Sequence, residues 1–198
     1  MTTFATRRTI GRRLFNLYLG LVLFGVSCAM LVASGLGLGP WDVFHQGLSE
    51  QLGISLGWVV VGVGVAVLLL WIPLRQRLGL GTISNAILVG LVIDATLTFL
   101  SQPGSMVARV GLMVAGVVIN GIATGLYIGA GLGPGPRDGL MTGLAARGHS
   151  IRVVRTAIEL TVLVVGWLLG GTVGVGTVLY ALSIGPLTHL FLPRMTVR

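Results

Sequence analysis

The chain consists of long runs of apolar residues separated by short clusters of arginine. The first run extends from residue 14 to residue 36 and contains no charged side chain. A run of about 18 or more apolar residues is long enough to cross a bilayer as a helix. Only 9% of the 198 residues are charged, against about a quarter in an ordinary soluble domain. The sequence therefore predicts an integral membrane protein with almost no soluble part.

Six candidate spans follow from the positions of these runs. Because a spanning segment must satisfy its own backbone hydrogen bonds, each is expected to be a helix, and the fold class is an all-α, polytopic transmembrane protein. The fifth and sixth runs are short and are interrupted by Gly170, Gly171 and Gly174, so five spans remain an alternative. The expected spans are residues 14–36, 57–74, 81–100, 108–130, 156–170 and 176–192.

The charges of the chain are strongly unbalanced, with 13 basic residues, all of them arginine, five acidic residues and a formal net charge of +8. In a soluble protein this excess would suggest nucleic-acid binding, but arginines in the short loops of a membrane protein hold those loops in the cytoplasm. We therefore expect no nucleic-acid partner, and a multi-pass membrane protein that contacts the lipid bilayer. Residues 1–13 are expected to be a basic cytoplasmic tail. They do not begin a cleaved export signal, because the apolar run that follows is too long.

Two glycine-proline segments of the chain are related in sequence. When residues 35–48 are compared with residues 131–144, eight of the fourteen positions are identical. The match continues after a one-residue gap, so that Gly81 faces Gly176. A fixed period of this kind indicates a duplication. We predict two membrane repeats of three spans each, residues 14–104 and residues 105–198.

The placement of the arginines predicts how the two repeats are oriented. If the N-terminus is cytoplasmic and each repeat crosses three times, the loops that contain Arg75, Arg147 and Arg152 fall inside, and Arg109 falls outside. Short loops of membrane proteins follow this bias. An odd number of crossings turns the second repeat upside down relative to the first. The sequence thus predicts an inverted repeat with both the N- and C-termini in the cytoplasm.

Each repeat contains a glycine-proline knot followed by a short amphipathic helix, expected at residues 41–52 and 137–146. Proline suits the first helical position, and Asp42 and Asp138 then lie in the first turn, where a carboxylate interacts favourably with the helix dipole. Stabilisation of the helix start would by itself explain both aspartates. The sequence leaves open whether these helices re-enter the membrane or lie flat at its interface.

A second interpretation gives the two knots a function. Broken helices at matching positions of two inverted repeats are the best sequence indication of a transporter's binding site. Irregular backbone at membrane depth is tolerated where it is buried or lines a cavity. His45 and Gln46 follow Asp42 by three and four residues and so share its helix face. We therefore predict a substrate site formed by Asp42, His45, Gln46 and Asp138, in which a pseudo-twofold axis relates Asp42 to Asp138.

Other polar residues lie within the predicted spans. Asp94 is deep in the third span, and its repeat counterpart is His189 in the sixth. Because ionisable residues are costly in a membrane, they are usually paired or functional. We predict an Asp94–His189 contact across the pseudo-axis, either as a static latch or as a proton-coupling pair. Arg155 and Glu159 are four residues apart, which predicts a local ion pair on one helix, and Asn120 is expected to join two helices by hydrogen bonding.

No sequence pattern indicates catalysis or a cofactor. Metal-ligand spacings, a phosphate-binding loop and a nucleophile elbow are absent. The single cysteine, Cys28, excludes a disulfide framework and a cysteine-based metal motif. We therefore expect no enzymatic activity, no cofactor and no metal.

The knots also carry a family resemblance. The chain resembles the bacterial YczE/YyaS/YitT group of small integral membrane proteins, and the likeness spans nearly its whole length. The resemblance implies a polytopic protein of the bacterial inner membrane and supplies neither a substrate nor catalytic residues. It rests on Gly37-Leu38-Gly39-Pro40-Trp41-Asp42-Val43-Phe44-His45-Gln46-Gly47-Leu48, on Gly79-Leu80-Gly81-Thr82 and on Gly133-Pro134-Gly135-Pro136-Arg137-Asp138-Gly139-Leu140.

These observations together predict a small-solute transporter that works by alternating access between its two halves, with the solute or ion unidentified. Two alternatives stay open. One is a membrane-embedded accessory or regulatory protein that acts through a partner membrane protein, and the other is a passive channel. The glycine-rich spans would also permit a homodimer.

Overall fold

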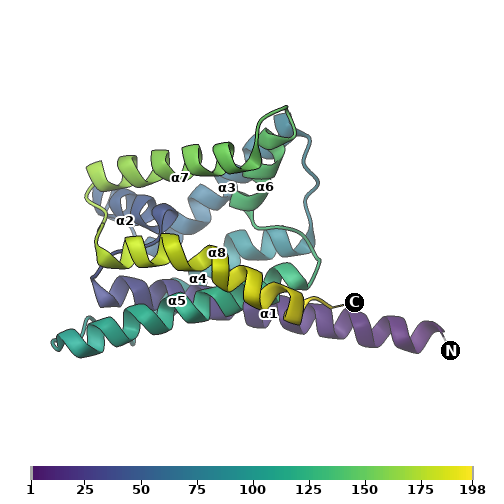
Figure 1. The fold of residues 1–198 in the computed structure, drawn as a ribbon, viewed down its shortest axis with the longest axis horizontal. Helices are drawn as coiled ribbons and strands as arrows, with labels where there is room; N and C mark the ends of the chain where they lie inside the picture. Colours follow the sequence, from purple (N-terminus) through teal and green to yellow (C-terminus); the bar gives the residue numbers. More distant parts are fainter. Residues whose placement is uncertain (1, 198) are drawn as a thin grey trace.

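The computed structural model describes the backbone of residues 2–197 and the side chains of residues 9–197. Within this part of the chain the fold is all-α and has eight helices (Figure 1). The side chains of Arg7 and Arg8, which belong to the expected basic tail, and that of Arg198 lie outside the described residues. The helices are α1 (Thr2–Ser34), α2 (Pro40–Leu52), α3 (Leu56–Leu74), α4 (Leu80–Leu97), α5 (Met106–Gly129), α6 (Pro136–Ala145), α7 (Ile151–Leu168) and α8 (Val175–Met195).

Five helices in the described residues are long and apolar enough to cross a membrane: α1 from Thr9, α3, α4, α5 and α8. The fifth predicted span, residues 156–170, lies in α7, which has 18 residues but carries Arg152, Arg155 and Glu159 in its first half. In Figure 1, α7 runs alongside the other long helices over a comparable length. The structure also begins α1 at Thr2, so the expected basic tail is, from that residue on, the first part of a helix.

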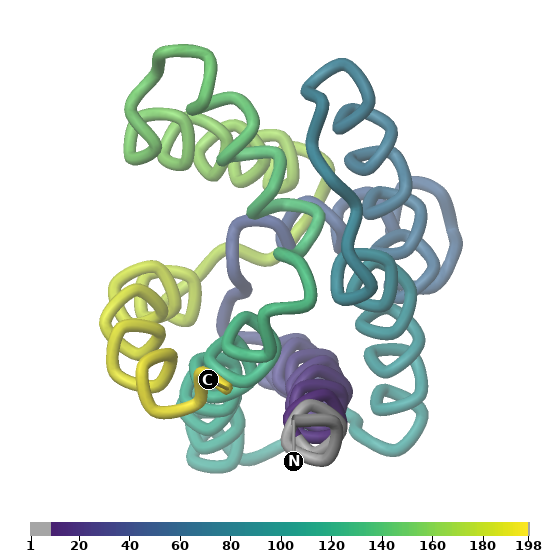
Figure 2. The backbone as a smooth tube through the Cα atoms, turned by 90° about the vertical axis from the view of Figure 1, so that its right-hand side faces the viewer, coloured from purple at the N-terminus to yellow at the C-terminus, as the bar shows by residue number. Residues whose placement is uncertain are grey.

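The helices α1 and α5 pack along each other. Small residues allow this close approach: a Cβ atom at Gly20 would lie 2.7 Å from the backbone nitrogen of Tyr127. Across the same interface, Asn120 Nδ2 donates a hydrogen bond to Ser27 Oγ at 2.8 Å, which confirms the role expected for Asn120. The helix α4 packs against α1 and α8 packs against α5, on opposite sides of the α1–α5 pair (Figure 2).

The short helices α2 and α6 are packed inside the bundle. The first residues of α2 are buried, and Asp42 lies 3.6 Å from the sulfur of Cys28. Since Cys28 is six residues before the end of α1, α2 starts about 9 Å below that end. The helix α2 packs against α7, and α6 packs against α3. The N-terminal turns of both short helices are therefore largely buried, whereas residues 50–52 at the C-terminal end of α2 are exposed.

A backbone hydrogen bond holds the loop before each short helix to a helix from the other half of the chain. In the loop before α2, the carbonyl of Leu36 accepts a hydrogen bond from the amide of Gly176, at the start of α8. In the loop before α6, the carbonyl of Leu132 accepts one from the amide of Gly81, at the start of α4. Both bonds measure 2.8 Å. Each loop is thus held by a helix from the other half of the chain.

Both chain ends lie at the same end of the molecule (Figure 1). The ends of α3 and α6 meet there, because Arg147 Nη2 donates a hydrogen bond to the carbonyl of Pro73 at 2.8 Å. At the opposite end, Arg109 donates hydrogen bonds to the carbonyls of Ser34 and Gly35, which closes the C-terminus of α1. The molecule therefore has one end that is rich in arginine. At the other end, Arg109 binds the backbone at the C-terminus of α1.

Candidate functional site

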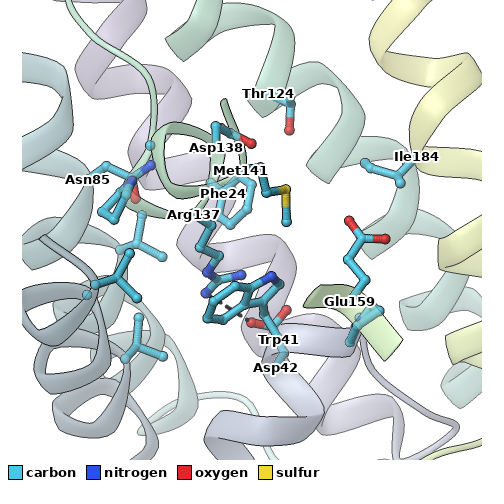
Figure 3. A pocket seen from close by; sticks show the side chains of 18 of the residues that line it. Phe24, Trp41, Asp42, Asn85, Thr124, Arg137, Asp138, Met141, Glu159 and Ile184 are labelled. Carbon is cyan, nitrogen blue, oxygen red and sulfur yellow. Dashed lines mark ion pairs between the residues drawn. The ribbon is translucent and has the colours of Figure 1, made fainter. Parts of the chain in front are cut away.

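A cavity of about 410 Å³ lies in the middle of the bundle, and all eight helices contribute to its wall (Figure 3). This volume is in the range of pockets that hold small organic ligands. The N-terminal turns of α2 and α6 both reach this cavity, because each is preceded by a glycine-rich loop that carries the chain inward. Polar and charged wall residues are Asp42, His45, Asn85, Thr124, Tyr127, Arg137, Asp138, Arg155, Glu159, Tyr180, Thr188 and His189.

An ion pair joins the two short helices at the cavity wall. Arg137 Nη2, on α6, lies 3.5 Å from Asp42 Oδ1, on α2 (Figure 3). The same nitrogen lies 3.4 Å from His45 Nδ1, and the Arg137 guanidinium lies 5.2 Å from the centre of the Trp41 ring. The distance between the charged atoms is longer than a close charge-assisted hydrogen bond, which measures about 2.7–2.9 Å. The pair thus has room to tighten or to separate.

The Asp42 side chain is buried and has three neighbours that respond to its charge. Besides Arg137, His45 Nδ1 lies 3.5 Å from Asp42 Oδ1, and the thiol of Cys28 donates a weak hydrogen bond to Asp42 Oδ2. A buried carboxylate without a partner is strongly destabilising in a membrane protein. The cation of Arg137 therefore allows Asp42 to remain charged at this position.

Asp138 has a different environment. Tyr127 donates a hydrogen bond to Asp138 Oδ2 at 2.8 Å, and the Asp138 side chain is half-buried at the cavity wall. Among the described residues, Asp138 forms no ion pair. The two aspartates at matching positions of the two glycine-proline segments therefore differ: Asp42 has a cationic partner and Asp138 has a phenol.

His45 and Gln46, the other two predicted site residues, both lie on α2, but only His45 lines the cavity. His45 is buried at the cavity wall. Gln46 is not part of that wall, and its Oε1 accepts a hydrogen bond from the amide of Thr172 at 2.8 Å, in the connection between α7 and α8. Gln46 therefore attaches α2 to the second half of the chain.

The structure does not bring Asp94 and His189 together. Asp94 accepts hydrogen bonds from Ser55 Oγ at 2.5 Å and from the amide of Gly57 at 2.7 Å, so it caps the N-terminus of α3. His189 lies on α8 at the cavity wall. The expected contact between them fails because α4 and α8 pack on opposite sides of the α1–α5 pair (Figure 2).

Several residues of the cavity wall were not among the predicted site residues. Arg137 aligns with Trp41 when the two halves are compared. Because the two residues differ, the comparison did not indicate Arg137 as a site residue. Arg155 and Glu159 form the expected local ion pair, with Arg155 Nε 2.8 Å from Glu159 Oε1, but they also stand at the cavity wall. An arginine inside a polar membrane segment is the signal that could have indicated Arg137.

No group of three or more histidine, cysteine, aspartate or glutamate side chains in the described residues is arranged to hold a metal ion. The site consists instead of charged pairs, aromatic rings and apolar side chains around a cavity. Such an arrangement can hold a small molecule through a few polar contacts and an apolar wall.

Known proteins similar to this chain cover most of its length. An uncharacterized protein of Haemophilus influenzae is 43% identical over 189 residues, which are 95% of this chain and 85% of that protein. The uncharacterized membrane protein YczE of Bacillus subtilis is 33% identical over 181 residues, 89% of this chain and 84% of YczE. The uncharacterized protein YyaS of the same bacterium is 27% identical over 182 residues, 88% of this chain and 90% of YyaS. No solved structure matches the chain.

The match to a protein family is equally extensive. The family of unknown function DUF6198 matches residues 11–193, from the first turns of α1 to the last turn of α8. The five candidate spans agree with the name of YczE, an uncharacterized membrane protein. The chain is therefore a multi-pass membrane protein that belongs to the DUF6198 family, together with proteins similar to YczE and YyaS.

Proposed function

We propose that the protein is a small-solute transporter that works by alternating access between its two halves. The observation that carries this proposal is the meeting of α2 and α6 at the central cavity, where Arg137 of one short helix pairs with Asp42 of the other. Broken helices that meet at a central site are characteristic of transporters built from two repeats. The solute would bind beside this ion pair.

The helix boundaries support a duplication. The helices α2 and α6 begin 96 residues apart, at Pro40 and Pro136. The starts of α3 and α7, and those of α4 and α8, are 95 residues apart. The contacts also occur in matching pairs, since α2 packs on α7 as α6 packs on α3. We interpret the chain as two inverted repeats that exchange their short helices.

The two halves differ in a way that suits a transport cycle. The helices α3 and α4 pack along each other, whereas α7 and α8 diverge around the cavity (Figure 2). Arg155 is half exposed on α7. In the proposed cycle, closure of α7 against α8 accompanies separation of α3 from α4, and the Asp42–Arg137 pair changes its geometry as α2 and α6 move.

The orientation of the protein follows from its charges. The chain ends lie at the same end of the molecule as the α6–α7 connection, which contains Arg147 (Figure 1), and arginine-rich ends of bacterial membrane proteins face the cytoplasm. We therefore place both termini in the cytoplasm and Arg109 at the outer face of the bacterial cell membrane.

Solute uptake tests the proposed function directly. Purified protein is first screened by thermal shift against ions, amino acids, nucleobases and small organic ions. A compound at a hundred times its dissociation constant stabilises the folded state by about 2.7 kcal/mol. A stabilising compound is then offered, radiolabelled, to proteoliposomes. The expected result is saturable uptake that is lost in the Asp42→Asn/Asp138→Asn variant.

Glu50 provides the matched control, because its side chain is exposed on α2 away from the cavity. Glu50→Gln should transport like the wild type. Full uptake by the double variant would overturn the site, and uptake that never saturates would favour a passive channel. A stoichiometric protein partner together with the absence of any uptake would favour an accessory role.

A further inference from the structure

The charges that face the central cavity do not cancel. Asp42 is paired with Arg137, and Glu159 is paired with Arg155. Asp138 is the remaining carboxylate of the wall, and among the described residues it has no cationic partner. With both wall histidines neutral, the cavity has a formal charge of −1. A site enclosed by protein and lipid favours a ligand that neutralises this charge.

Polar groups converge around Asp138. A Cβ atom placed on Gly135 would lie 3.3 Å from Asp138 Oδ2 and 3.5 Å from both Asn85 Nδ2 and the Tyr127 hydroxyl. The Tyr127 hydroxyl donates a hydrogen bond to Asp138 Oδ2, whereas Asp138 Oδ1 accepts no hydrogen bond from the described residues. One carboxylate oxygen is therefore held in place and the other is available to a ligand.

The wall around this carboxylate is large and mostly apolar. Phe24, Trp41 and Tyr180 contribute aromatic rings, and valines of α3 and α4 complete it. Ring faces attract cations. A cavity of about 410 Å³ with such walls suits an organic body, since a bare inorganic ion would leave the apolar surface uncovered. Two polar groups of the wall, Trp41 Nε1 and His45 Nε2, are also buried without a hydrogen-bond partner in the chain.

The cationic groups of the wall are already engaged, which argues against an anionic ligand. The guanidinium of Arg137 faces Asp42, and that of Arg155 faces Glu159. The positive N-termini of α2 and α6 each carry their own aspartate in the first turn, so their dipoles are compensated locally. An anion would have to separate one of these pairs.

We infer that the ligand of the central cavity is a small monovalent organic cation, an amine or ammonium compound, whose charged nitrogen binds Asp138 and whose body packs among the aromatic rings. This inference rests on the proposed function for its physiological meaning, but binding itself can be measured without transport. The acceptor for the cation is Asp138 Oδ1, and Tyr127 positions the carboxylate.

Three compounds of the same shape test the inference: benzylamine, benzyl alcohol and benzoate. Their binding to the detergent-purified protein is measured by calorimetry and thermal shift. Benzylamine should bind, and its affinity should exceed those of the other two by at least about tenfold, which corresponds to about 1.4 kcal/mol. In Asp138→Asn the advantage of the amine over the alcohol should disappear. Tyr127→Phe should keep the advantage but reduce it.

Glu50→Gln serves as the control and should bind benzylamine as the wild type does. The unliganded melting temperature and gel-filtration profile of each variant show whether it is folded. If Asp138→Asn does not fold, Tyr127→Phe takes its place: a reduced preference for the amine over the alcohol supports the inference, and an unchanged preference overturns it. Binding of benzoate in preference to benzylamine, an unchanged amine preference in Asp138→Asn, or no binding by any of the three compounds would overturn the inference.

The same compounds separate this inference from the proposed function. Benzylamine that binds through Asp138 but is never taken up by proteoliposomes would leave the cation site in place and remove the transporter. Saturable uptake of an anion by a protein that does not bind benzylamine would have the opposite meaning.

Discussion

Asp42 and Arg137 lie on different short helices, from different halves of the chain, and their charged atoms are 3.5 Å apart inside the bundle. No segment of regular structure connects α2 directly to α6. The pair joins α2 to α6, together with the contacts of the Arg137 guanidinium to His45 and to the Trp41 ring. Removal of one member leaves the other charge uncompensated, and breaking a buried pair in this way typically costs about 3–5 kcal/mol.

The first prediction concerns the energetic coupling of this pair. Asp42→Asn and Arg137→Gln should each destabilise the protein, and the double variant should be less destabilised than the sum of the two. A double-mutant cycle on unfolding in detergent should give a coupling of about 1–3 kcal/mol. The half-exposed pair Arg155–Glu159 is the control and should couple by about 0–1 kcal/mol. Additive effects at Asp42 and Arg137 would contradict the connection described here.

The second prediction concerns the packing of α6 against α3. A Cβ atom on Gly139 would overlap the indole ring of Trp71, whose Nε1 donates a hydrogen bond to the carbonyl of Pro136 at 3.0 Å. Gly139→Ala should therefore destabilise the protein by about 1–3 kcal/mol, because overpacking displaces the short helix. Thermal unfolding measures the change.

Gly62 is the matched control for Gly139. It lies in α3, and a Cβ atom there would meet nothing within 4 Å. Gly62→Ala should be neutral or stabilising, by up to about 1 kcal/mol, because alanine loses less backbone entropy in a helix. Equal losses at the two positions would mean that α6 does not pack as described.

The third prediction separates a structural from a functional role for Asp94. Because Asp94 caps the N-terminus of α3, Asp94→Ala should cost about 1–3 kcal/mol of stability by leaving the amide of Gly57 unsatisfied. Ligand affinity at the cavity, measured below the melting temperature of the variant, should stay within a factor of about two. A large loss of affinity with unchanged stability would restore a functional role to Asp94.

The fourth prediction concerns topology. In a Cys28→Ser background, a cysteine at His149, in the α6–α7 loop, should react with an impermeant thiol reagent only after cells are opened. A cysteine at Glu50, near the C-terminal end of α2, should react in spheroplasts with intact membranes. Both native side chains are exposed. Reaction of both cysteines from the same side would contradict the assigned orientation.

The sequence predicts most of the helices because the apolar runs are long. The five apolar helices lie within a few residues of their expected positions. The starts of α1 and α7 are less well predicted, at Thr2 against residue 14 and at Ile151 against residue 156. Hydropathy reports which part of a helix can face lipid, and both helices continue into charged turns that lipid would not accept.

The candidate site was predictable where local pattern decides it. Asp42, His45 and Asp138 reach the cavity because each follows a glycine-proline loop that fixes the start of a short helix. The proposed Asp94–His189 contact failed because repeat counterparts meet only if they lie near the relating axis. Arg137 was missed because its role depends on a partner from the other half, which no single segment of sequence contains.

The crosswise hydrogen bonds of the two loops have a consequence for biosynthesis. The loop before α2 is held by the amide of Gly176, a residue that leaves the ribosome long after α2 itself. Until α8 is synthesised, the carbonyl of Leu36 lacks the amide that donates a hydrogen bond to it. Until α7 is synthesised, α2 also lacks the helix against which it packs. The first half of the chain therefore cannot complete its own fold during translation. The membrane insertion machinery must tolerate an unfinished first half until the last helix arrives.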